Sequence, residues 1–76
     1  MKSESDLRFT RSRIIDRLNQ TAENIAFAKQ AMSLAVINKG VGSNAFKFWK
    51  GEEARHSSTF QALRMELRDV DYEING

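Results

Sequence analysis

The sequence contains no cysteine and no proline, and only four of its 76 residues are glycine. Without cysteine, neither a disulfide nor a thiolate metal site can brace the fold. Without proline, the strongest helix breaker is missing. A chain this short buries only about 60 % of its unfolded surface, so we expect self-association to supply further stabilisation.

Long apolar runs are missing as well. No stretch approaches the roughly 18 apolar residues of a membrane span, and the polar residues 1–6 are not followed by the apolar core of a secretory signal. Twelve Lys or Arg against ten Asp or Glu leave a net charge of only +2. We expect a cytoplasmic protein without membrane contact.

The second half of the chain carries an uninterrupted hydrophobic pattern with steps of three and four residues. Such spacing keeps one face of a helix turned toward a partner. It predicts a helix over about residues 45–71, with a break at Gly51 as the alternative. The nine positions of this series, hereafter the seam, are Phe46, Trp49, Glu53, His56, Phe60, Leu63, Leu67, Val70 and Ile74.

The first half predicts a second helix, over about residues 5–38. Ser3 or Ser5 suits its start, and the sequence Asn38-Lys39-Gly40 suits its end because glycine favours a left-handed cap. Residues 39–44 form the turn, in which Ser43 or Asn44 can cap the following helix. The apolar stripe of this first helix comprises Leu7, Ile14, Leu18, Ile25 and Met32, with Thr21, Ala28 and Ala35 between them.

A turn this short makes the two helices antiparallel neighbours. Folding about residue 41 places residue i opposite approximately residue 82 − i, so that Leu63 meets Leu18 and Trp49 lies beside Met32. The two apolar stripes agree in this register. The predicted fold class is therefore an all-α protein, a single domain formed by an antiparallel two-helix hairpin.

Two helices cannot enclose a core, and residues 25–37 are apolar nearly all round the helix. A helix with this pattern is buried on more than one side. We therefore expect two hairpins to form a four-helix bundle, because closed two-fold pairs are the commonest homo-oligomers. The expected oligomer core comprises Ile25, Phe27, Leu34, Trp49, Phe60 and Leu63.

Glu53 and the only histidine, His56, interrupt the apolar seam one turn apart. One interpretation is a buried polar layer that fixes the register. In it, His56 hydrogen-bonds Glu53 or a residue of the second copy, and Glu53 pairs with Lys29. The other interpretation is a metal site, because both side chains project from the same helix face. We assign no cofactor from the residues alone.

This Glu-x-x-His spacing resembles the di-iron motif of ferritin-like proteins. The hairpin is also similar to the encapsulated half-ferritins, whose iron site forms between two dimerised hairpins. The resemblance implies Glu53 and His56 as ligands from the second helix, with Glu23 as the candidate ligand from the first.

Two further groups of residues suggest macromolecular partners. A hairpin dimer with a basic surface could track a nucleic-acid backbone, as plasmid copy-number RNA-binding hairpins do. Arg13 and Arg17 are the candidates closest to one face, within a set that comprises Arg8, Arg11, Arg13 and Arg17 on the first helix and Lys47, Lys50, Arg64 and Arg68 on the second. Phe48, flanked by Lys47 and Lys50, lies off the seam and could anchor a protein partner.

No second acid, nucleophile or oxyanion device accompanies Glu53 and His56, so we do not expect an enzyme. We expect a small homo-oligomeric regulatory protein of the bacterial or phage accessory type that binds a macromolecular partner, most simply a protein. The alternatives are a nucleic-acid-binding hairpin dimer and a half-ferritin-like metal protein.

Overall fold

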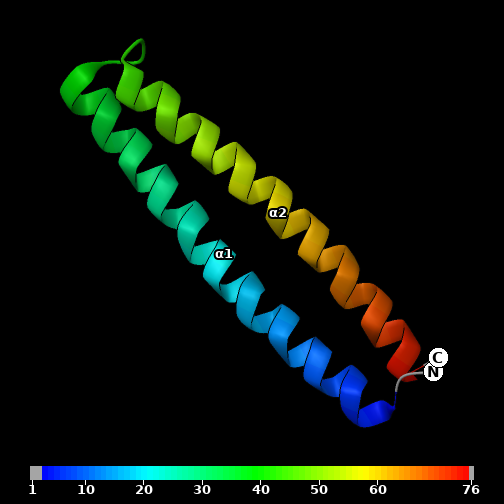
Figure 1. Cartoon of the computed structure of the whole chain (residues 1–76). Coiled ribbons are helices and arrows are strands. Elements are labelled where there is room, and N and C mark those ends of the chain that lie inside the picture. The colour runs from blue at the N-terminus through cyan, green and yellow to red at the C-terminus, as the bar shows by residue number, and fades with distance from the viewer. Residues whose placement is uncertain (1–2, 76) are drawn as a thin grey trace.

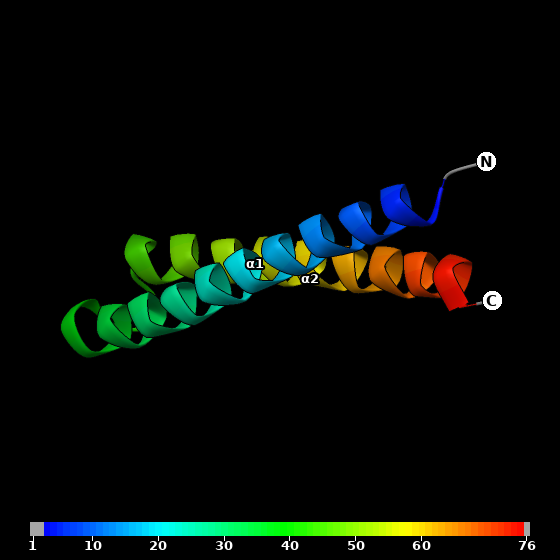
Figure 2. The ribbon, with the colours of Figure 1, turned by 90° about the horizontal axis from the view of Figure 1, so that it is seen from below.

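The computed structural model describes residues 3–75, which form two helices, α1 (Glu4–Lys39) and α2 (Asn44–Asn75), and no strand. The helices lie side by side and antiparallel, with both termini at one end and the turn at the other (Figure 1). They cross at a shallow angle (Figure 2), and the Cα atoms occupy a rod of 53 × 14 × 14 Å. The predicted all-α hairpin is confirmed.

A capping side chain at one end and a glycine at the other define the ends of α1. The Ser3 hydroxyl accepts a hydrogen bond from the Asp6 N–H at 3.2 Å, and Glu4 and Asp6 place negative charge in the first turn, where the helix dipole favours it. At the other end Gly40 adopts a φ of 89°. Its N–H donates to carbonyl oxygens in the last turn, which satisfies groups that the helix end would leave unpaired.

Helix α2 begins after Ser43, whose hydroxyl accepts a hydrogen bond from the Phe46 N–H at 3.1 Å. It passes through Gly51 without a break. It also continues to Asn75, four residues beyond the predicted end at residue 71. Ile74 extends the apolar seam over this last turn, and residues 71–74 include no proline or glycine that would stop the helix.

The buried residues of α1 recur every seven positions. A period of seven residues keeps the same face of a helix in contact with a partner helix that crosses it at a small angle. The buried side chains become smaller toward the turn, where α2 contributes bulky aromatic residues. The series comprises Leu7, Ile14, Thr21, Ala28 and Ala35.

All nine residues of the seam on α2 are buried or half-buried. Leu63 is the most deeply buried of them, with 2 % of its surface exposed. The hydrophobic pattern therefore identified the face of α2 that packs on α1. None of the helices within residues 3–75 has a stretch long and apolar enough to cross a membrane.

One ion pair across the hairpin shows directly which residues of the two helices lie opposite each other. Arg11 Nε donates to Asp71 Oδ1 at 2.6 Å, and these residue numbers sum to the predicted 82. The ring of Trp49 packs edge-on against Phe27, with centroids 5.4 Å apart. Its predicted place beside Met32 stays a prediction.

Candidate interaction surfaces

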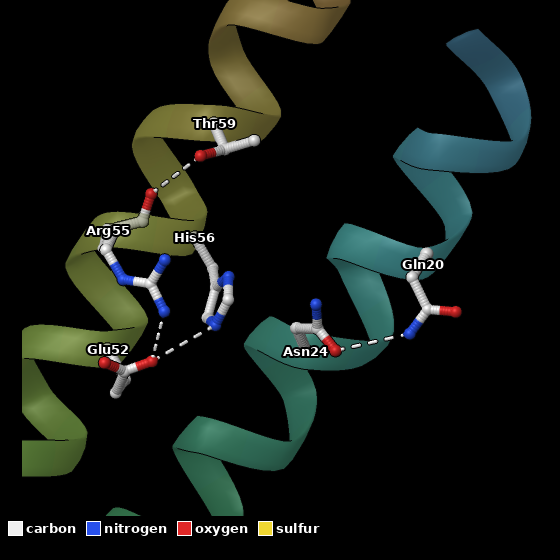
Figure 3. Close-up of polar contacts among 6 residues, drawn as sticks. All are labelled: Gln20, Asn24, Glu52, Arg55, His56 and Thr59. Atoms are coloured by element: carbon white, nitrogen blue, oxygen red, sulfur yellow. Dashed lines mark hydrogen bonds and ion pairs between the residues drawn. The ribbon is translucent and has the colours of Figure 1, made fainter. Parts of the chain in front are cut away.

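A small polar cluster surrounds His56 in the middle of α2. Glu52 Oε2 accepts a hydrogen bond from Arg55 Nη2 at 2.6 Å and lies 3.5 Å from His56 Nε2. Figure 3 shows His56 pointing from α2 toward α1, where Asn24 lies opposite and accepts from Gln20. The Arg55 guanidinium holds the pKa of the Glu52 carboxyl below its ordinary value, and His56 adds a smaller effect in the same direction.

Glu52 rather than Glu53 is therefore the carboxylate that lies beside His56 in the hairpin. The predicted contact between His56 and Glu53 is wrong within one chain, and the alternative contact with a second copy stays a prediction. Residues three apart and four apart on a helix are both neighbours, so spacing alone does not choose between the two carboxylates. Arg55 donates to the same Glu52 oxygen that lies beside His56. Glu53 Oε1 accepts a hydrogen bond from Ser57 at 3.4 Å. It forms no ion pair with Lys29 or with any other residue in the described range.

The residues suggested as metal ligands do not assemble within one chain. Glu53 and His56 are half-buried on the seam, whereas Glu23 is exposed on α1. Within residues 3–75, no group of three or more His, Asp or Glu side chains is placed to hold a metal ion. A site of the half-ferritin kind would need ligands from a second copy.

Apolar side chains gather on one side of the hairpin near the turn. Trp49 connects them, because its ring packs edge-on against both Phe27 and Phe48, with centroids 5.4 and 5.0 Å apart. Next to Trp49 lies a shallow hollow of about 260 Å³, to which Leu34 also contributes and which reaches Lys39 at the end of α1. We define the turn-end patch as Phe27, Ala31, Leu34, Ala45, Phe48 and Trp49.

The turn-end patch leaves large side chains open to solvent. Phe27, Leu34 and Phe48 are 61 %, 52 % and 57 % exposed. Of the expected oligomer core, Phe27 and Leu34 thus lie outside the hairpin's own core. Its other members, Ile25, Trp49, Phe60 and Leu63, lie between the helices and are buried or half-buried.

Arg13 and Arg17 lie together, as their spacing predicted, but a carboxylate accompanies them. They line a hollow of about 250 Å³ with Glu66 of α2. The Arg13 guanidinium also lies over the Phe9 ring, 5.9 Å from its centroid. A carboxylate in the hollow opposes the attraction of a phosphate group.

The opposite flank of the hairpin carries most of the positive charge. Arg11 and Asp71 mark this flank, because their side chains meet there together with Arg8 and Ile15. Steps of three and four residues from Arg11 trace one stripe along α1, and the same steps from Asp71 trace one stripe along α2. Each stripe lies beside the face that packs on the other helix. We define the basic side by the Lys and Arg of these two stripes: Arg8, Arg11, Lys29, Lys39, Lys47, Lys50, Arg64 and Arg68.

Only two acids, Glu4 and Asp71, lie on the same stripes, and they pair with Arg8 and Arg11. The other six cations form no ion pair with a described residue. The rest of the sequence holds four Lys or Arg and eight Asp or Glu. A chain of small net charge therefore presents one strongly positive flank.

From the sequence alone, the Lys and Arg of both helices formed one group, with Arg13 and Arg17 as the nucleic-acid candidates. In the hairpin these two arginines lie on the other flank, whereas Lys47, Lys50, Arg64 and Arg68 share one stripe of α2 on the basic side. The spacing of these residues by three and four places them on one helix face, and the seam shows that this face is a flank of the hairpin.

No family model, curated protein or solved structure matches this chain.

Proposed function

We propose that this protein is a small, non-enzymatic regulatory protein whose hairpins associate in pairs and bind a macromolecular partner. The turn-end patch is the observation that carries this proposal. It exposes three large apolar side chains around Trp49 on one flank. Contiguous exposed apolar surface of this kind is typical of protein–protein contacts.

The surface area of a single hairpin supports pairing. The chain exposes 5776 Å², whereas a compact monomer of 8.7 kDa exposes about 4,700 Å². The excess of about 1,000 Å² is similar to the roughly 800 Å² that each partner buries in a standard interface. A second copy laid along one flank would bury an area of this size.

Charge selects the flank through which two copies would meet. Pairing through the basic side would bring eight cations of each copy together with only two acids. The flank with the turn-end patch offers aromatic and aliphatic surface instead. It also carries both Arg13 and Glu66, so charges of both signs are available to a second copy there. The proposed four-helix arrangement therefore buries the turn-end patch and leaves both basic sides outward.

Sedimentation equilibrium across a dilution series tests this proposal. We expect the wild type to have twice the monomer mass of 8.7 kDa at low micromolar concentration. Leu34→Glu should shift the protein toward monomer, because a carboxylate would be buried against apolar surface. Met65→Glu is the matched control, since Met65 is 59 % exposed and lies away from the patch on α2.

A wild type that remains a folded monomer throughout the series would contradict the proposal. An equal loss of association in Leu34→Glu and Met65→Glu would contradict the assignment of the interface to the turn-end patch.

The half-ferritin-like alternative requires a metal site that is shared between the two copies of the dimer. It requires Glu53 and His56 to combine with a carboxylate of a second copy, because one chain does not assemble three ligands in its described part. Stoichiometric iron or zinc in the purified dimer, lost in His56→Ala with the mass unchanged, would support that alternative over a purely structural layer.

A further inference from the structure

We propose that the basic side binds double-stranded DNA through its phosphate groups. This inference goes beyond the proposed function and does not require self-association. It rests on the segregation of charge: eight cations and two acids occupy the two stripes that define this flank. Only Arg8 and Arg11 are engaged by those acids.

The dimensions of the basic side suit a duplex. Lys47 and Arg68 are 21 residues apart on one straight helix, which corresponds to about 32 Å, close to one turn of B-DNA. A second row, from Arg8 to Lys39, runs along α1. Packed helices lie about 8–10 Å apart, so the two rows can approach phosphates on both walls of a major groove about 12 Å wide.

The composition of the basic side favours a duplex over a single strand. Proteins that bind single strands stack the bases on aromatic side chains. None of the seven aromatic residues lies on the two stripes. Between Lys29 and Arg11 on α1, the stripe holds only uncharged residues, of which Ala22 alone is exposed: Ile15, Leu18, Ala22 and Ile25.

Cation contacts to phosphates do not read base identity. We therefore expect binding that is insensitive to sequence and steeply dependent on salt. If four to six cations neutralise phosphates, the logarithm of the affinity should fall with the logarithm of the salt concentration with a slope of about −4 to −5.

Fluorescence anisotropy with a labelled 20-base-pair DNA duplex provides the test, using the full-length protein and a series of salt concentrations. The variant is Arg64→Gln/Arg68→Gln, which removes two cations from the basic side. The matched control is Arg13→Gln/Arg17→Gln, which removes two arginines of identical spacing from the opposite flank. Because Arg13 lies on the proposed pairing flank, sedimentation of this control separates a loss of pairing from a loss of DNA contacts. All four side chains are exposed, so both variants should fold.

We expect Arg64→Gln/Arg68→Gln to weaken DNA binding about tenfold or more and to reduce the salt slope by about two. The control should change the affinity less than about twofold. A scrambled duplex should bind as well as the first.

Three results would overturn the inference. The first is no binding at about 50 mM salt, where phosphate contacts are strong. The second is an equal loss in both variants, which would indicate a response to net charge alone. The third is tighter binding of single-stranded DNA or of an RNA duplex of the same length, which would assign the surface to a different nucleic acid. Sedimentation of Arg64→Gln/Arg68→Gln should still give the wild-type mass, so failure of this inference is distinguishable from failure of the proposed pairing.

Discussion

Leu63 carries more of the hairpin's core than any other single side chain of α2. Only 2 % of its surface is exposed, and it packs on the heptad series of α1. Replacing a buried leucine by alanine removes apolar contacts and leaves a cavity. We expect Leu63→Ala to lower the free energy of unfolding by about 2–5 kcal/mol, measured by urea denaturation.

Ile37→Ala is the control for this experiment, because Ile37 is 78 % exposed. It should change the free energy of unfolding by less than about 0.5 kcal/mol. Equal effects of the two substitutions would mean that Leu63 is not buried between the helices.

Glu52 makes the stability of the hairpin depend on acidity. The pKa of its carboxyl lies below the ordinary value of 4.5, chiefly because Arg55 donates a hydrogen bond to it. A depressed pKa in the folded state stabilises the fold above the ordinary pKa, and this contribution is lost as the pH falls through the folded-state value. The wild type should therefore exceed Glu52→Gln in stability near neutral pH.

The difference between the wild type and Glu52→Gln should shrink as the pH falls below 4.5 toward the pKa of the folded state. Urea denaturation at several pH values measures it. Glu23→Gln removes an exposed carboxylate that forms no ion pair with a described residue and serves as the control. A difference that grows on acidification would contradict the role assigned to Glu52.

The residue scale also shows where sequence reasoning failed. The Glu-x-x-His pattern drew attention to Glu53, yet Glu52 pairs with His56. Both carboxylates are within one turn of the histidine, and the choice depends on side-chain direction and on Arg55, which binds Glu52. Spacing alone does not contain that information.

Among the helices, α2 contains one residue of low helix propensity in its interior, Gly51. A glycine inside a helix is about 1 kcal/mol less favourable than alanine, and a Cβ added at Gly51 would meet no atom within 4 Å. We expect Gly51→Ala to raise the free energy of unfolding by about 0.5–1 kcal/mol, measured by urea denaturation.

Gly40 provides the opposite case. A Cβ there would also meet no atom within 4 Å, but the φ of 89° disfavours every residue with a side chain. Gly40→Ala should therefore destabilise the hairpin. Stabilisation by both substitutions would show that Gly40 does not hold the conformation of a helix cap.

The helices themselves were largely predictable from the sequence. The seam from Phe46 to Ile74 and the capping residues Ser3 and Ser43 are local signals, and local signals determine where helices run and which face they bury. The end of α2 was misplaced by four residues because no stop signal occurs before Asn75. Side-chain packing in the turn-end patch could not be predicted, because it depends on the orientations of the aromatic rings relative to the neighbouring alanines.

At the scale of the whole molecule, a single hairpin is an extended object. Its radius of gyration is 16.9 Å, whereas a compact domain of this length has about 11 Å. The two flanks differ in chemistry: one carries the turn-end patch and the other is the basic side. Such a molecule can join a second copy through the first flank and leave the second free for a polyanion.

The basic side illustrates what appears only at this scale. Positive and negative residues are spread along the whole sequence and nearly cancel in number, which gives a net charge of only +2. Sorting the same residues by their position around the helices separates eight cations from most of the acids. That sorting requires the register, which the Arg11–Asp71 ion pair establishes.

Pairing of two copies through the turn-end patch is tested most directly with Trp49, which is the only tryptophan of the chain and the centre of that patch. Acrylamide quenching of its fluorescence should be measured over a dilution series. If copies pair through this patch, the quenching constant should be low at high protein concentration and rise as the dimer dissociates. A quenching constant that stays the same in samples whose mass changes from dimer to monomer would contradict the account.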